Sequence, residues 1–391
     1  MSGGRKPRVA LHWSKRTQTA EGAVFDDGML RVERVAASSL IDGAHAMLGM
    51  LAPRDGFECH FTRALDQPLG RGDSRSAIAE LLRVRRATLL PNDRGAILGT
   101  VESTLAYVAA LRRRLDRFIM GTFTSAGGAL IATSATRRIA AVACDPAMLN
   151  DRIEGCLGDV EAPQPLSSQA LVALLDRTQI AQHLETWIAV GEAAGAEAAA
   201  HAGVCGAHKI IFPGHAGAAP TVGMLLADGH IRLERVWQGE ANIPGDPLLS
   251  PEIRLREVFR ELLDEVAARV TQLGYDIDDV ECSRRVLLDS SGRRIDIVPL
   301  PTFTTIDEIE SLSRSGEKQK LVGAEVSAII DLPKPVLPPT AFSSTIRGAG
   351  VPDDRIVLGP GKMLACLCEI DVPAGWRAEW EPCGDVVMTR V

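Results

Sequence analysis

Apolar and polar positions follow two alternating periods along the chain, which is typical of an α/β protein. Residues 8–35 alternate apolar runs with polar turns, and the Asp-Asp-Gly at 26–28 predicts the turn of a β-hairpin. Apolar residues then recur at helical spacing in 39–50 and 76–84, and the segment 55–65 between them has the pattern of a strand. We therefore expect strands at the start of the chain, followed by alternating helices and strands.

The centre of the chain continues this alternation. The segment 103–119 predicts one amphipathic helix, and we expect its Arg112–Arg114 run to face solvent. The apolar face of this helix consists of Leu105, Val108, Leu111, Leu115 and Ile119. Strands are predicted within 121–131, leading into a Gly-Gly turn, and within 138–149, while the alanine-rich 189–202 predicts a tightly packed helix.

The segment 209–230 has the pattern of a strand, a glycine-rich turn and a helix of small residues. Glycine lets backbones approach closely, so such a turn either holds a phosphate or seats the helix tightly on the strand edge. We favour close packing, because the acidic and phosphate-binding companions that a phosphate site requires are missing from the sequence.

The segment 241–254 contains three prolines and a glycine, which makes it the best candidate for a boundary between two units. We place a first domain at 1–242 and a C-terminal domain at 243–391, with a β-rich tail from about 346. Each unit is long enough to bury a core of its own.

The C-terminal domain is predicted to begin with a long helix at 251–273. Ser250 is the expected N-cap and Pro251 the first helical residue, and apolar residues recur at three- and four-residue intervals. Two strands joined at 289–292 are expected to follow this helix.

The composition is that of a globular protein, with 46% hydrophobic and 24% charged residues in a chain of 391. A net charge of −7 and an aromatic content of 4% disfavour a nucleic-acid surface. The first residues lack the continuous apolar core of a secretory signal, and no apolar run reaches the roughly 18 residues of a membrane span. We therefore expect a cytoplasmic protein with neither nucleic acid nor membrane as partner, and its eight scattered cysteines as reduced thiols.

Four ordered segments resemble the A-type subunit of the hydantoinase/oxoprolinase family, whose relatives include ATP-dependent ketone carboxylases. In 106–130 a helix and a strand lead to Ser125, Gly127 and Gly128, which match a Ser-Asn-Gly-Gly turn of that family except that Ala126 replaces Asn. Two further matches are 142–147, which reads Val-Ala-Cys-Asp-Pro-Ala, and 206–228, which ends in Leu-Leu-Ala-Asp. The resemblance continues in 251–301 and in 358–388, which contains Pro-Ala-Gly-Trp.

This resemblance, which runs from about residue 103 to the end, implies a fold class as well as a function. It implies a reduced actin-like, or ribonuclease-H-like, α/β domain followed by a mixed α/β, β-rich C-terminal domain. Family members hold nucleotide phosphates in two Asp-x-Gly-Gly-Thr-x-Thr-Asp-type loops, and neither loop occurs in this sequence. The phosphate-binding half is therefore expected to be missing.

Three glycines remain as candidates for nucleotide binding, namely Gly127, Gly128 and Gly191. Beside Gly191 stands Glu192, whose carboxylate would repel a polyphosphate. We expect no resident cofactor, with ATP and Mg²⁺ as the alternative, and we expect no metal site. Cys366, Cys368 and Cys383 are expected to be structural thiols, with Cys366 and Cys368 on one strand, because a metal would need further ligands at suitable spacing.

Two functions follow from these observations. The first is a structural or regulatory subunit of a cyclic-amide hydrolase or ketone carboxylase complex, partnered by a B-type or another A-type subunit. A separate option is an active ATP-dependent A-type subunit whose missing half is supplied by another chain. The second is a self-sufficient small-molecule amidohydrolase that uses the cleft between the two domains. Its candidate catalytic groups are Ser125, Cys144, Asp145 and His215.

Overall fold

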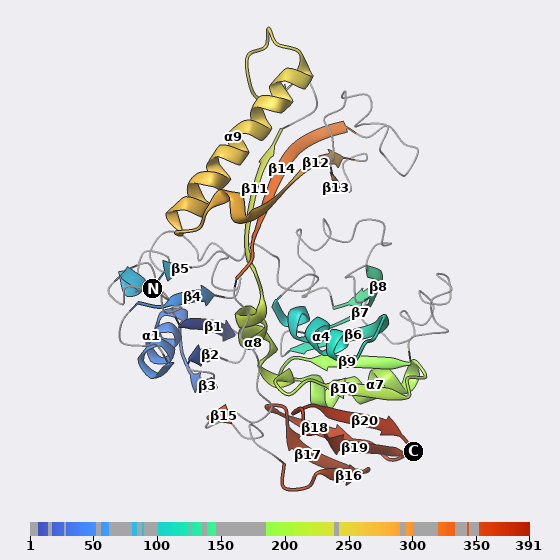
Figure 1. Ribbon diagram of the computed structural model, residues 1–391. Helices are drawn as coiled ribbons and strands as arrows, with labels where there is room; N and C mark the ends of the chain where they lie inside the picture. Colours follow the sequence, from blue (N-terminus) through green and yellow to red (C-terminus); the bar gives the residue numbers. More distant parts are fainter. Residues whose placement is uncertain are drawn as a thin grey trace.

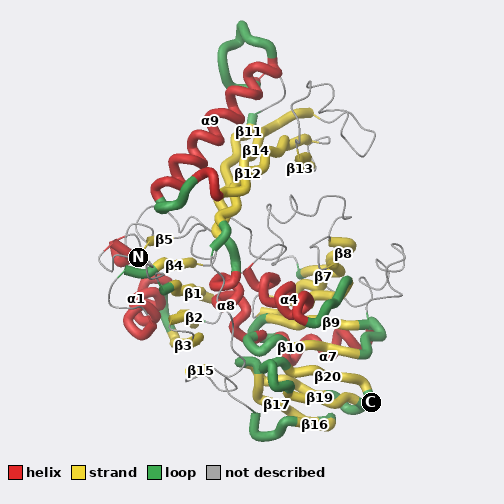
Figure 2. Tube along the Cα trace, viewed as in Figure 1, coloured by secondary structure: helices red, strands yellow, loops and turns green. Residues whose placement is uncertain are grey.

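The described residues form two large sheets and a two-stranded sheet in the body of the molecule, and a further sheet that projects from it with a long helix (Figure 1). Figure 2 shows helices between and around the two sheets of the body. The computed structural model of the protein describes residues 7–14, 18–26, 29–51, 56–61, 80–83, 88–89, 101–124, 127–134, 139–145, 185–237, 242–289, 295–299, 320–332, 342–343 and 352–391.

The first sheet has the strand order β15-β3-β2-β1-β4-β5. Strands β1, β2 and β3 form an antiparallel meander, whereas β1, β4 and β5 are parallel. The strands are β1 (Arg8–Ser14), β2 (Thr19–Asp26), β3 (Met29–Ala36), β4 (Glu58–Phe61), β5 (Thr88–Leu89) and β15 (Phe342–Ser343). Helix α1 (Leu40–Leu51) packs on one face. The predicted N-terminal strands and first helix are confirmed; of the helix predicted at 76–84, residues 80–83 are helical and the remainder lies outside the described residues.

The second sheet repeats this arrangement. Strands β6, β7 and β8 form an antiparallel meander, and β6, β9 and β10 are parallel, in the order β8-β7-β6-β9-β10. The strands are β6 (Arg117–Thr124), β7 (Gly127–Ser134), β8 (Ile139–Cys144), β9 (Thr186–Val190) and β10 (Lys209–Phe212). Helix α7 (Ala194–Val204), the predicted alanine-rich helix, covers one face through its small buried side chains.

Two copies of one five-stranded unit, each in the order 3-2-1-4-5, form the duplicated ribonuclease-H-like arrangement of an actin-like fold. The predicted fold class is therefore confirmed. The expectation that one half is missing is wrong, because both units are present. The sequence lacks the expected loop motifs but keeps the strand pattern, and the loops can change while the buried strands persist.

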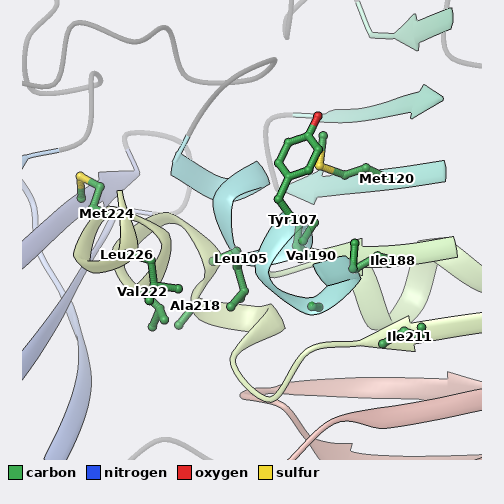
Figure 3. Close-up of a cluster of buried hydrophobic side chains, with 14 of the residues drawn as sticks. Leu105, Tyr107, Met120, Ile188, Val190, Ile211, Ala218, Val222, Met224 and Leu226 are labelled. Atoms are coloured by element: carbon green, nitrogen blue, oxygen red, sulfur yellow. The ribbon is translucent and has the colours of Figure 1, made fainter. Parts of the chain in front are cut away.

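The two units are joined by helices that follow their last strands. Helix α4 (Val101–Arg112) comes after β5 but packs on β6 and β9, and α8 (Ala219–Leu226) comes after β10 but packs on β1 and β2. The two helices also pack against each other. Figure 3 shows this shared core, in which Tyr107 of α4 lies beside Met120, and Leu105 lies on the side of α4 toward Val222 and Leu226 of α8. The short helix η3 (Ala216–Ala218) precedes α8.

Helix α4 ends earlier than its pattern predicts. It stops at Arg112, Arg114 takes a positive φ of 54°, and Ile119 belongs to strand β6. A non-glycine residue in the left-handed region cannot continue an α-helix. Leu115 and Ile119 therefore match the helical spacing of apolar residues although neither belongs to the helix.

A projecting arm consists of helix α9 on a four-stranded antiparallel sheet in the order β11-β14-β12-β13. Ser250 caps α9 by accepting a hydrogen bond from the backbone of Ile253, as predicted. The elements are β11 (Gly229–Val236), α9 (Pro251–Gln272), η5 (Ile277–Asp279), β12 (Val280–Asp289), β13 (Ile295–Pro299) and β14 (Lys320–Ile330).

The C-terminal strands return to the body. Strand β20 pairs antiparallel with β10, so that Ile210 lies opposite Met388, and β19 and β16 continue the sheet. These elements are β16 (Ile356–Leu358), β17 (Gly361–Ala365), β18 (Cys368–Val372), β19 (Trp376–Trp380) and β20 (Val386–Arg390). The tail from about 346 therefore covers the free edge of β10, a strand of the predicted first domain. The division at 242/243 itself stays a prediction.

Among the helices described, none combines the length and the apolar character needed to cross a bilayer.

Candidate functional site

The sequence-predicted site residues lie along one edge of the second sheet. Strands β6, β8, β9 and β10 run in the same direction, and their carboxyl ends form this edge. In open α/β sheets, ligands bind outside the carboxyl ends of the strands. The predicted residues at this edge are Gly127, Gly128, Cys144, Asp145, Gly191 and His215. Ser125 lies outside the described residues.

Gly128 and Asp145 bind each other at this edge. The backbone N–H of Gly128 donates to Asp145 Oδ2 at 2.8 Å, and the backbone N–H of Asp145 donates to the Gly128 carbonyl at 3.0 Å. Beside them, Thr124 Oγ1 donates to the Gly127 carbonyl at 3.2 Å. An anion cradle needs converging backbone N–H groups, and that of Gly128 already binds a carboxylate of this chain.

Gly191 brings two backbone segments into close approach. Its φ is +108°, and a Cβ at this position would overlap the carbonyl oxygen of Phe123. Its N–H donates to the Ala216 carbonyl at 2.7 Å, and Ala193 donates to the Phe123 carbonyl at 3.1 Å. Glycine is therefore required here for packing between the ends of β6 and β9.

The glycine-rich turn after β10 also binds within the chain. Gly214 N–H donates to Asp385 Oδ1 at 3.1 Å, and Gly217 N–H donates to the Cys366 carbonyl at 2.8 Å. A Cβ at Gly217 would overlap the carbonyl oxygen of Leu367. This geometry agrees with the sequence-based interpretation that the glycines of 209–230 serve close packing.

Cys144 and His215 are not brought together. They belong to β8 and to the turn after β10, which are four strand spacings apart, or roughly 19 Å. Burial, and to a smaller extent the charge of Asp145, raise the pKa of Cys144 to about 11. Burial, and to a smaller extent the charge of Arg112, lower the pKa of His215 to about 3. A Cys144–His215 dyad is therefore excluded by geometry.

A row of charged groups crosses the first sheet, and the sequence reasoning did not find it. The strand register places His12 opposite Glu21, and Glu21 opposite Arg34. Side chains directly opposite each other lie on one face of a sheet. Glu21 is buried, and it forms an ion pair with the guanidinium of Arg34. We call His12, Glu21 and Arg34 the polar row.

The polar row faces the segment η3–α8. Thr221 Oγ1 donates to Glu21 Oε1 at 2.7 Å, and Arg34 Nη2 donates to the Gly217 carbonyl at 2.9 Å. Burial lowers the pKa of His12, although Glu21 and Glu192 oppose this shift. Burial would also lower the pKa of Arg34, but Glu21 raises it above its ordinary value. The predicted Glu192 is thus electrostatically coupled to the polar row.

Of the Arg112–Arg114 run, Arg112 and Arg114 are exposed as expected, whereas the side chain of Arg113 is only 16% exposed, which corrects the expectation for that residue. Asp385 is fully buried and accepts two hydrogen bonds of 2.6 Å from Arg112 Nη2. Arg113 Nη2 donates to Asp385 Oδ2 at 2.8 Å and to Glu381 Oε2 at 2.6 Å. Arg112 and Arg113 bind the buried Asp385 carboxylate because a buried charge needs a partner of opposite charge.

The nearby Cys383 adds a thiol to this acidic group. Potential ligand atoms of Glu381, Cys383 and Asp385 all lie within 4.8 Å of one another. The two carboxylates already bind arginines, so this group does not fit a metal ion.

Cys366 lies in the turn between β17 and β18, not on a strand as predicted, and its thiol donates to the Phe212 carbonyl at 3.4 Å.

No protein-family model and no curated protein sequence matches the chain. Among solved structures, the nucleotide-free structure of an acetone carboxylase, from work on ATP-dependent acetone carboxylation, is 12% identical. The match covers 90% of this chain and 78% of that one, with a TM-score of 0.49. An ATP-dependent caprolactamase from Pseudomonas jessenii is 13% identical over 81% of this chain and 67% of that one, with a TM-score of 0.46. Similarities of this size do not assign a family or a function.

Proposed function

We propose that the chain is a subunit of a hydantoinase/oxoprolinase-type complex that has a structural or regulatory role and does not bind ATP itself. The sequence resemblance and the duplicated actin-like topology support the scaffold part of this proposal. The acetone carboxylase and the caprolactamase are described as ATP-dependent, so the proposed lack of nucleotide binding is a specific difference to test.

One observation carries the proposal. The N–H groups of four glycines in the turns at this edge, Gly128, Gly191, Gly214 and Gly217, all donate to acceptors within the chain. A phosphate site at such turns depends on N–H groups that point at the ligand. Because these four N–H groups already donate hydrogen bonds within the chain, they do not point at a bound phosphate.

Charge supports the same interpretation. Glu192 follows Gly191 directly, and its carboxylate is close enough to influence the titration of His12 and Arg34. A polyphosphate placed beside Gly191 would meet a like charge at Glu192.

Calorimetry with Mg-ATP tests the nucleotide part of the proposal on the full chain. We expect no binding at micromolar concentrations. A Glu192→Gln variant, which lacks the carboxylate, should also fail to bind, because the glycine N–H groups stay engaged. Micromolar binding by the unaltered chain would falsify the proposal, whereas binding by the variant alone would show that charge and not backbone geometry excludes the nucleotide.

The partner is tested by co-expression with an A-type and a B-type hydantoinase/oxoprolinase subunit, separately, followed by size-exclusion chromatography. Stoichiometric co-elution with either subunit supports the role in a complex. Separate elution from both subunits contradicts it.

The alternative, a self-sufficient amidohydrolase, has less support. Cys144 is a buried thiol with a pKa of about 11, and His215 is a buried imidazole some four strands away. Turnover of a cyclic amide by the isolated chain, abolished by replacing Ser125, Cys144, Asp145 or His215, would restore this alternative.

A further inference from the structure

The polar row does more than neutralise charge within one sheet. Glu21 and Arg34 belong to β2 and β3 of the first unit, whereas their partners Thr221 and Gly217 follow the last strand of the second unit. We propose that Glu21 and Arg34 form a latch that holds the first sheet against the segment η3–α8 and makes the closed arrangement of the two units the resting state. This inference holds whether or not the chain binds a nucleotide.

The geometry of the carboxylate supports a latch. Oε1 of Glu21 accepts from Thr221, and Oε2 accepts from Arg34, so both oxygens are bound. The Glu21 side chain is only 7% exposed. When the units separate, this carboxylate loses its hydrogen bond from the Thr221 hydroxyl, and the apolar side chains around it, among them Ala10 and Ala23, become exposed to water. Both losses disfavour opening, because a charge-assisted hydrogen bond is broken and apolar surface is hydrated.

The guanidinium of Arg34 has a second function in the latch. Its hydrogen bond to the Gly217 carbonyl attaches the first sheet to η3, and the Gly217 N–H in turn binds the Cys366 carbonyl. Arg34 also lies close enough to lower the pKa of the Cys368 thiol, whose net shift is upward because of burial. The latch therefore reaches the hairpin β17–β18 through η3.

The turn of this hairpin is strained. Cys366 and Leu367 have positive φ angles of 55° and 63°, which non-glycine residues rarely adopt. Leu367 is buried in the core shared by both units, directly against Gly217. Strained turns persist only where the surroundings hold them. The latch keeps η3 in the position that holds this turn, so opening the latch should loosen the hairpin as well.

Hydrogen exchange of the full chain, followed by mass spectrometry, tests the latch. Glu21→Gln removes the charge but keeps an oxygen for Thr221. We expect exchange to accelerate about tenfold or more on both sides of the junction, in 29–36 and in 215–226, and to accelerate in 361–372. The arm helix 251–272 should not change.

The matched control is Glu33→Gln, which removes a carboxylate from the adjacent position of β3, on the opposite face of the sheet. It should leave exchange in 215–226 unchanged. Acceleration confined to 19–36 in Glu21→Gln overturns the proposal, because the pair would then stabilise only its own sheet. The same holds if the control loosens 215–226 equally.

A second variant keeps the test decisive if Glu21→Gln does not fold. Thr221→Val removes one hydroxyl from α8 at nearly constant volume. If the latch joins the two units, exchange in β2 (19–26) accelerates together with exchange in 215–226. Acceleration in 215–226 alone overturns the proposal.

Discussion

Arg113 reaches from the end of α4 to the fully buried Asp385 beside β20, and its Nη2 donates to Asp385 Oδ2 at 2.8 Å. We predict that Asp385→Asn lowers the free energy of unfolding by about 2 kcal/mol, because it removes the charge that binds Arg112 and Arg113 and weakens the hydrogen bonds to them and to Gly214. Chemical denaturation of the full chain measures this loss.

The exposed pair Arg377–Glu379 in β19 provides the control. Both side chains are more than 40% exposed, so Glu379→Gln should change the unfolding free energy by less than about 1 kcal/mol. If Asp385→Asn costs no more than Glu379→Gln, the buried cluster does not fasten α4 to the C-terminal strands.

Gly191 should tolerate no side chain. Its positive φ and the carbonyl oxygen of Phe123 both exclude a Cβ, so we predict that Gly191→Ala destabilises the protein by about 3 kcal/mol or more. Gly203 in α7 is the matched control, since a Cβ there meets nothing within 4 Å. Gly203→Ala should stabilise the chain by up to about 1 kcal/mol. Thermal unfolding of both variants checks the contrast; similar shifts for both would contradict it.

Elements whose ends are set by neighbouring residues, such as helix caps and turn residues, were predictable from the sequence. Helix α9 begins where Ser250 and Pro251 supply a cap and a favourable first residue, and β12 ends at Asp289 as the turn signal indicates. The end of α4 was not predictable, because the apolar spacing continues to Ile119 although the backbone changes direction at Arg114. Apolar spacing records burial and not the backbone conformation that produces it.

The polar row could not be found by spacing along the chain. Glu21 and Arg34 are 13 positions apart, and Glu21 and Thr221 are 200 apart. Only the strand register and the packing of α8 on the first sheet bring them together. One signal was available, since Glu21 alternates in phase with the apolar Ala23 and Phe25, which marks a charge on a buried face.

Cys144 should be chemically inert. With a pKa of about 11, roughly one thiol in a thousand is ionised near pH 8, and the side chain is buried. We predict that iodoacetamide modifies the exposed Cys282 while Cys144 stays unmodified in the folded chain, and that both react after denaturation. Peptide mass spectrometry measures the two rates. Rapid modification of Cys144 under native conditions would revive it as a nucleophile.

Buried histidines should make the protein sensitive to mild acid. Burial lowers the pKa of both His60 and His215 to about 3, with Arg8 contributing at His60 and Arg112 at His215. In the unfolded chain a histidine has a pKa of about 6.5. Below that pH the unfolded chain binds protons that the folded chain does not. Stability is therefore complete above about pH 6.5 and falls by about 1.4 kcal/mol per pH unit for each histidine as the pH drops toward 3.

Replacing one of these histidines should reduce this slope. Between about pH 7.5 and pH 5, His60→Leu should lose roughly 2 kcal/mol less unfolding free energy than the unaltered chain, because one titrating group is gone. The unaltered chain, measured at the same two pH values, is the reference. Urea denaturation at the two pH values gives the slopes directly. Equal slopes for His60→Leu and the unaltered chain would mean that His60 takes up its proton in the folded state, which requires a partner or water at its ring that lowers the cost of burying the charge.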